Sequence, residues 1–132
     1  MELTTNEGEL DAGLAPTPNY RYADRAGSRL YVAGQVPHDT ESQLVGHGDP
    51  VAQATQCLEN LFTLIAHHGF SKHDIHQLTV YVVGAQQNLR NAWVAVTNGF
   101  DGNVPPATLL GVALLGYVDQ LVEVDAVVER LP

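Results

Sequence analysis

The chain has 132 residues, of which 45% are hydrophobic, and a formal net charge of −9. This length suits one domain around a single core, and the hydrophobic share is too high for a disordered chain. Six basic residues scattered among fifteen acids exclude a nucleic-acid-binding surface, which needs clustered Lys and Arg, and disfavour binding to anionic membranes. With no apolar run of about 20 residues, no signal-peptide pattern and one cysteine, we expect a cytoplasmic protein without disulfides.

The N-terminal residues 1–19 are polar and contain Pro16 and Pro18, so we predict an extended or frayed arm ahead of a single domain at 20–132. Strands are predicted at 20–26 and 29–36, with a turn at Gly27 and Ser28 that makes them a hairpin. Gly34 interrupts the second strand, which indicates close backbone approach there. Residues 37–48 carry turn formers and are predicted to form a loop or a short strand excursion.

The first long helix is the clearest element. Asp49 is a good N-cap, Pro50 suits the first helical position, and His67, His68 and Gly69 suit a C-terminus. One apolar stripe recurs at helical spacing and consists of Val51, Ala54, Leu58, Leu61 and Ile65. A short turn follows at 71–75, and the apolar run 78–83 predicts a strand buried on both faces.

A second helix is predicted from Asn88, its N-cap, to Asn98, with Gly99 as the stop. Its inward residues are expected to be Leu89, Ala92, Trp93 and Val96. Strands are then predicted at 107–115 and 120–129. The last strand alternates, with four apolar residues facing one way and Glu123, Asp125 and Glu129 facing the other.

The element order β-β-α-β-α-β-β predicts an α+β fold with one mixed sheet and both helices packed on one face. The other face then lacks a cover. Tyr81 or Val83, together with Leu110 and Val112, are expected there, and apolar residues of this kind are costly to leave in water. Because exposed apolar faces mark sites of association, we predict an oligomer.

The six histidines show none of the spacings typical of zinc sites. His67 and His68 are neighbours at a helix end, so they are expected to point about 100° apart. We therefore interpret the histidines as surface and helix-end residues, with a metal site as the alternative. Cys57 is interpreted as a partly buried apolar residue, with a nucleophile as the alternative. No glycine-rich phosphate-binding loop occurs.

Glu123 and Asp125 are two residues apart on a strand, which puts them on one face about 6.6 Å apart. Paired carboxylates at this distance can do acid/base work if burial separates their pKa values. The alternative is a solvated strand face. Contact of that face with another subunit would favour the first interpretation.

Five segments in this order resemble the RidA family, also called YjgF-like or L-PSP endoribonuclease. They are RLYVAGQVPHD (29–39), QATQCLENL (53–61), LTVYVV (78–83), PPATLLGVALL (105–115) and LVEVDAVV (121–128). The resemblance covers about residues 20–129. It implies a chorismate-mutase-like fold and a homotrimer with clefts between subunits. It also implies hydrolysis of reactive enamines and imines, such as 2-aminoacrylate, without a metal or organic cofactor.

The resemblance also implies the site residues. Glu123 matches the glutamate that helps position water, Tyr20 the tyrosine that lines the cleft, and Gly34 the glycine of a glycine-glutamine pair. Ala33 stands where a serine is usual, and Leu110 where a cysteine is frequent. Trp93 is also assigned to the ligand site.

The main departure is Thr108, which stands where the family's carboxylate-binding arginine follows the Pro-Ala pair. A bidentate arginine contributes roughly 2–3 kcal/mol, which one neutral hydroxyl cannot replace. Arg21 and Arg90 are the candidates to substitute for it. We therefore carry two hypotheses, hydrolysis of imines, enamines or related C–N compounds and a non-catalytic trimer that binds a metabolite or partner protein. Ribonuclease action is disfavoured by the acidic charge.

Overall fold

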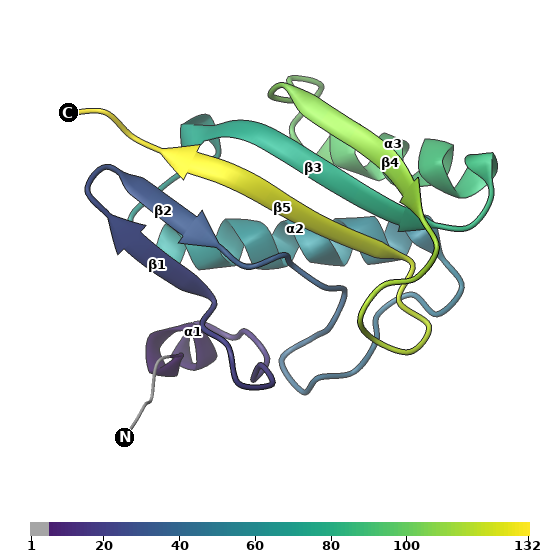
Figure 1. Cartoon of the computed structure of the whole chain (residues 1–132), viewed down its shortest axis with the longest axis horizontal. Helices are drawn as coiled ribbons and strands as arrows, with labels where there is room; N and C mark the ends of the chain where they lie inside the picture. Colours follow the sequence, from purple (N-terminus) through teal and green to yellow (C-terminus); the bar gives the residue numbers. More distant parts are fainter. Residues whose placement is uncertain (1–5) are drawn as a thin grey trace.

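The computed structural model describes residues 6–132 as one sheet with helices against it (Figure 1). Within those residues, no helix combines the length and the apolar character that crossing a bilayer requires. The helices are α1 (Glu7–Asp11), α2 (Pro50–His67) and α3 (Gln86–Gly99), with a 3-10 turn η1 (Lys72–Asp74). The strands are β1 (Ala23–Ala26), β2 (Arg29–Val32), β3 (Ile75–Val83), β4 (Ala107–Val112) and β5 (Val122–Glu129).

The five strands lie in the order β1-β2-β5-β3-β4. Only β3 and β4 are parallel, and the other three pairs are antiparallel, which makes the sheet mixed. The two long helices cover one face of this sheet (Figure 1). The predicted α+β class, strand and helix order, and one-sided helical layer are therefore confirmed.

Helix α2 starts where its capping residues predict. The Asp49 carboxylate accepts hydrogen bonds from the backbone N–H groups of Val51 and Ala52 at 3.0 and 3.2 Å. Four residues of the predicted stripe are buried in the core, namely Ala54, Leu58, Leu61 and Ile65. Val51, the first residue of the predicted stripe, is instead 41% exposed. Cys57 is fully buried rather than partly so.

Strand β3 alternates rather than being buried on both faces. Leu78, Val80 and Val82 face the helices and have no exposed surface, whereas Thr79, Tyr81 and Val83 are only partly covered. The expectation of two buried faces is thus wrong for a single chain, because the helices lie on one side only. The alternation predicted for β5 is confirmed, with Val122, Val124 and Val128 in the core and Ala126 partly buried against it.

Several elements are shorter or shifted. Strand β2 ends at Val32, after which Gln35 forms an isolated bridge with Val124 of β5. Strand β4 ends at Val112, and α3 begins at Gln86, two residues before the predicted cap, so that Ala85 is its N-cap. The Asn88 side chain instead donates to the Val83 carbonyl at 3.0 Å.

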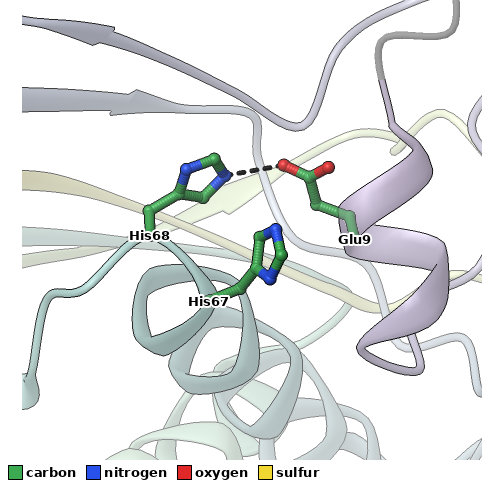
Figure 2. Close-up of side chains that lie close together, drawn as sticks. All are labelled: Glu9, His67 and His68. Carbon is green, nitrogen blue, oxygen red and sulfur yellow. Dashed lines mark hydrogen bonds and ion pairs between the residues drawn. The ribbon is translucent and has the colours of Figure 1, made fainter.

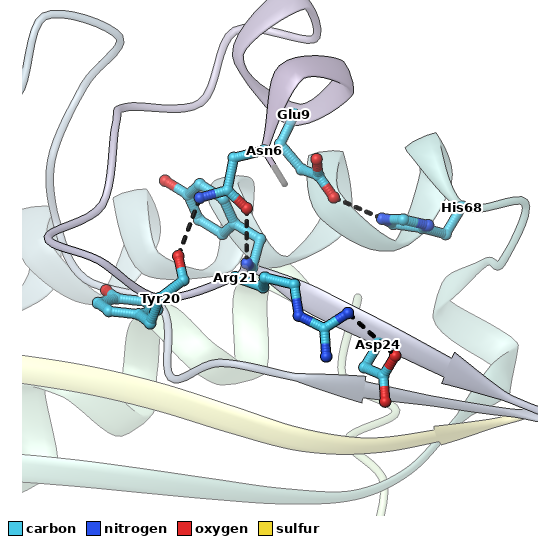
Figure 3. Close-up of polar contacts among 7 residues, drawn as sticks. Asn6, Glu9, Tyr20, Arg21, Asp24 and His68 are labelled. Carbon is cyan, nitrogen blue, oxygen red and sulfur yellow. Dashed lines mark hydrogen bonds and ion pairs between the residues drawn. The ribbon is translucent and has the colours of Figure 1, made fainter. Parts of the chain in front are cut away.

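The N-terminal segment packs against the domain, so the extended arm is wrong for residues 6–19. Glu9 of α1 meets His68 at the end of α2, with 2.6 Å between Glu9 Oε2 and His68 Nε2 (Figure 2). Asn6 bonds the Tyr20 carbonyl and the Tyr22 backbone N–H, each at 2.9 Å (Figure 3). Leu14 is buried against Tyr22. Leu14 is an apolar residue within a polar segment, and the overall composition of that segment did not reveal that it packs against the domain.

Candidate functional site

An open pocket of about 380 Å³ lies where the first residues of β5 meet the segments on either side of the hairpin. Three residues expected in the site line it together: Tyr20 before β1, Gly34 after β2, and Glu123 on β5. The complete lining, which we call the Glu123 pocket, is Pro18, Tyr20, Gly34, Val36, Gly116, Tyr117 and Glu123. Segments far apart in sequence thus converge on one carboxylate.

The Glu123 side chain lies directly over Gly34. A Cβ built on Gly34 would fall 2.1 Å from Glu123 Oε2 and 2.9 Å from its Cδ. Real Cβ atoms essentially never come so close to a neighbour, so this position admits no side chain while the carboxylate stays in place. A close approach at Gly34 is therefore found, but the approaching group is the side chain of the candidate catalytic residue Glu123 and not a second backbone segment.

Gln120 holds the other end of the same carboxylate. This residue is 3% exposed, and its side-chain amide donates to Glu123 Oε1 at 3.1 Å and to the Val122 carbonyl at 3.0 Å. The side-chain oxygen of Gln120, Oε1, accepts a hydrogen bond from the Tyr117 backbone N–H at 3.2 Å. Because both ends of the amide are occupied, its orientation is determined, and it fixes Glu123 Oε1.

The environment of Glu123 raises the pKa of its carboxyl group. Burial raises the pKa of the Glu123 carboxyl, the hydrogen bond from Gln120 acts in the opposite sense, and the charge of Asp125 raises it further. A carboxyl with a raised pKa exchanges a proton more readily near neutral pH than an exposed one. The carboxyl at this pocket is thus suited to general acid/base work.

Asp125 lies on the same face of β5, as predicted, but has a different partner. Its Oδ2 accepts a hydrogen bond from the Tyr81 hydroxyl at 2.7 Å. That hydrogen bond, with burial and the charges of Asp125 and Glu123, raises the pKa of Tyr81 to about 12. The two carboxylates therefore differ in role, since one faces the pocket and the other is held by a phenol.

The two β4 residues of the predicted site lie apart from Glu123 within the chain. Leu110 pairs with Tyr81, which pairs with Glu123, so the three form one row across the open face. Thr108 pairs with Thr79 and belongs to the next row, with Asp125. Two strand spacings put β4 roughly 10 Å from β5. Neither Thr108 nor Leu110 lines the Glu123 pocket.

The remaining predicted residues are placed as follows. Ala33 precedes Gly34, and its carbonyl accepts from the Gln35 side chain at 2.9 Å. Trp93 packs at the edge of the core from α3, on the helical side of the sheet, and is not brought together with the pocket residues.

Neither arginine considered as a substitute reaches the pocket. Arg21 is exposed and contacts Asp24 at 3.3 Å, and Arg90 is exposed and donates to Gln87 at 2.9 Å (Figure 3 shows the first pair). Across residues 6–132, the Glu123 pocket has no arginine in its lining.

Sequence reasoning missed Tyr117, Gln120 and His38. The His38 ring packs edge-on against Tyr117 with 4.6 Å between centroids, and burial lowers the pKa of His38. Burial, followed by the nearby Tyr117 hydroxyl, raises the pKa of Tyr20. The three missed residues, Tyr117, Gln120 and His38, lie in or beside loops, where no periodic pattern of residues indicates a role. The one available signal was the position of Gln120 three residues before Glu123.

Comparison with known proteins shows the family of this chain. Residues 11–130 match the family described as Endoribonuclease L-PSP. The chain belongs to this family, which includes RidA. The structure of RidA from an Antarctic Psychrobacter bacterium superposes with a TM-score of 0.79 at 22% identity, over 91% of this chain and 95% of that one. Escherichia coli TdcF with bound serine gives 0.72 at 23% identity, over 89% and 91%.

Two RutC family proteins are related in sequence. The one from Sulfurisphaera tokodaii is 27% identical over 115 residues, which cover 87% of this chain and 90% of that protein. The one from Pyrococcus horikoshii is 37% identical over 70 residues. That match spans 52% of this chain and 56% of the relative, so the chain covers little more than half the length of this relative.

Proposed function

We propose that this RidA family chain hydrolyses small imines, enamines or related C–N compounds at the Glu123 pocket, with Glu123 as the general base. The observation that supports this is the combination of a half-buried carboxyl with a raised pKa and two fixed neighbours, Gln120 on one oxygen and Gly34 beneath the other. A carboxylate so restrained spends little free energy on orientation when it meets a ligand.

The chemistry follows from a base beside an open pocket. Water attacks the carbon of the C=N bond and Glu123 takes one proton from that water. Glu123 then returns this proton to the nitrogen, which completes a neutral carbinolamine and restores the carboxylate. Collapse of the resulting carbinolamine breaks the C–N bond and gives a carbonyl compound and ammonia. Positioned proton transfer of this kind contributes about 10²–10⁴-fold to a rate.

The lining favours neutral substrates. Tyr20, Tyr117 and Val36 supply apolar surface, and Glu123 is an acid, so a carboxylate ligand would meet like charge without an arginine to bind it. This agrees with Thr108 at the position that the family resemblance assigns to the carboxylate-binding arginine. We therefore propose substrates without a carboxylate, and not 2-aminoacrylate.

We further propose that the chain forms a homotrimer through the face of the sheet opposite the helices. That face carries Tyr31, which is 51% exposed, together with Tyr81, Leu110 and Val112. A cover from neighbouring subunits would remove this surface from water. It would also bring a neighbour's Thr108 and Leu110 toward the Glu123 pocket, which they do not reach within one chain. Light scattering at micromolar concentration tests this, and a monomer would refute it.

The test of catalysis compares two carboxyl replacements on one strand. Glu123→Gln removes the base, whereas Glu129→Gln changes an acid at the far end of β5, where it accepts from Ser28 at 2.9 Å. With enzymatically generated imines, with and without a carboxylate, we expect turnover of the neutral imine to fall about 100-fold or more in Glu123→Gln only. Equal turnover in both variants, or none above the spontaneous rate, would refute the proposal.

The second candidate is a binding module without turnover, favoured by the absence of an arginine from the pocket lining. It is separated from the enzyme by calorimetry with the same ligands. Binding of a neutral ligand that persists in Glu123→Gln, with no turnover in the unaltered chain, would favour it.

Thr108→Arg is expected to raise affinity for benzoate or 2-oxobutyrate by roughly 30-fold or more if β4 forms the other wall.

A further inference from the structure

A second group of chemically capable side chains lies away from the Glu123 pocket. Glu9, His67 and His68 each offer one ligand atom, and these three atoms lie within 4.8 Å of one another (Figure 2). The carboxylate comes from α1 and the two imidazoles come from the end of α2, so the group joins two elements. The two rings lie nearly perpendicular, with 5.0 Å between their centroids.

The helix end explains why adjacent histidines converge. Successive residues within a helix point about 100° apart, which would separate the rings. His68 is the C-cap of α2, and its backbone is no longer helical, with φ −94° and ψ 8°. Its ring contacts that of His67 and reaches the Glu9 carboxylate of α1. The expected divergence of about 100° does not keep the rings apart, since their ligand atoms lie within 4.8 Å of each other.

Helix α1 is shaped to receive both rings. Gly8 faces His67, and a Cβ built on Gly8 would lie 2.3 Å from His67 Nε2, so a side chain there would displace the imidazole. The next residue, Glu9, presents its carboxylate to His68 at 2.6 Å. A glycine followed by a glutamate thus places one ring against the backbone and the other against the carboxylate.

The buried Glu9 carboxylate would be stabilised by a bound cation. Glu9 is 4% exposed, and a buried carboxylate is costly unless a positive charge compensates it. Among residues 6–132, the one basic group within ion-pair distance of Glu9 is His68, whose ring is charged only when protonated. The His67 side chain makes no hydrogen bond among residues 6–132, and its ring offers one nitrogen as a ligand atom.

We propose that Glu9, His67 and His68 form a zinc site that fastens α1 to the end of α2. Two imidazoles and one carboxylate are a zinc donor set that leaves a fourth position for water. Tetrahedral coordination at about 2.0–2.1 Å requires donor separations of about 3.3 Å. The separations here range from 2.6 Å to at most 4.8 Å, so side-chain rotations of the order of 1 Å complete the geometry.

The consequence of such a site is structural. Helix α1 has five residues and is too short to be stable alone. Its neighbour Asn6 bonds the backbone on either side of Arg21, at Tyr20 and Tyr22, so a metal at Glu9 would also steady the segment that leads to the Glu123 pocket. Binding to the folded chain alone raises its stability by mass action.

The experiment uses the full chain without a histidine tag. Zinc binding is measured by calorimetry on chelator-treated protein, and donor geometry by the visible spectrum of the cobalt(II) form. His67→Ala is the decisive variant, because His67 is exposed and its loss should leave the fold intact. His73→Ala, an exposed histidine in η1, is the matched control.

We expect one zinc per chain, a melting temperature raised by about 5 °C or more at tenfold excess over the dissociation constant, and a tetrahedral cobalt spectrum. His67→Ala and Glu9→Gln should weaken zinc binding at least about 100-fold, with His73→Ala unchanged. After chelator treatment, His67→Ala and the unaltered chain should have equal melting temperatures. Absence of zinc binding at micromolar concentration, or equal affinity in His67→Ala, would overturn the site and leave Glu9 and His68 as a simple ion pair.

Discussion

Replacing Gly34 by alanine separates the stability of the fold from the placement of the Glu123 carboxylate. The added methyl would lie 2.1 Å from Glu123 Oε2, so the oxygen must retreat by about 1.3 Å to reach ordinary contact at 3.4 Å. Because that atom is the far end of a flexible side chain, the retreat distorts side-chain torsions rather than the backbone. Such a distortion costs about 0.5–1.5 kcal/mol.

The expected effect on folding is therefore small and the effect on the site large. We expect the melting temperature of Gly34→Ala to fall by about 2–6 °C. A displacement of 1 Å at a catalytic group can cost about 100-fold in rate, so turnover, where present, should fall by about that factor. The Gln120 side-chain amide, which donates to Glu123 Oε1 at 3.1 Å, should shift its NMR resonances.

The matched control is Gly111→Ala in β4. A Cβ there would meet its nearest atoms at 3.8 Å, which is ordinary contact. This variant should leave the Gln120 resonances and turnover unchanged. The reasoning is refuted if Gly34→Ala leaves the Gln120 resonances in place. A loss of more than about 4 kcal/mol, typical of core disruption, would equally refute it.

Three other outcomes follow from buried or partly covered polar groups. Gln53→Ala should destabilise the chain by about 3–4 kcal/mol in chemical denaturation, because its side chain accepts from one backbone N–H and donates to two carbonyls. Stability should fall as pH rises from 10 to 12, since the unfolded chain ionises its tyrosines first, and Tyr81→Phe should reduce that slope. Cys57, whose thiol pKa burial raises, should resist thiol reagents until unfolding, and rapid labelling of the native chain would contradict this.

The regular elements could be predicted because their residues repeat with a period. The Asp49 cap and the stripe through Leu58 and Leu61 locate α2, and the alternation around Val124 locates β5 and puts Glu123 opposite the core. Periodicity reports which side of an element is buried. It does not report how many layers cover the sheet, which is why β3 appeared buried on both faces.

The candidate site could be predicted in part. The family resemblance gave Tyr20, Gly34 and Glu123, which line one pocket. It could not give Gln120 or Tyr117, because their roles depend on the path of the loop before β5. Composition also concealed α1, since its few buried contacts depend on Glu9 meeting His68, a partner 59 residues away.

The alternation of β5 has a consequence for how the pocket is assembled. Shifting this strand by one residue against β3 would send Glu123 and Asp125 into the apolar layer and expose Val122 and Val124 to water. Each buried, unpaired carboxylate would cost several kcal/mol, comparable with the whole stability of a small domain. Of these two alignments, the stable one is the observed register, which presents Glu123 to the pocket. The register of β5 therefore couples folding to the site: a one-residue shift that turned Glu123 away from the pocket would also destabilise the fold.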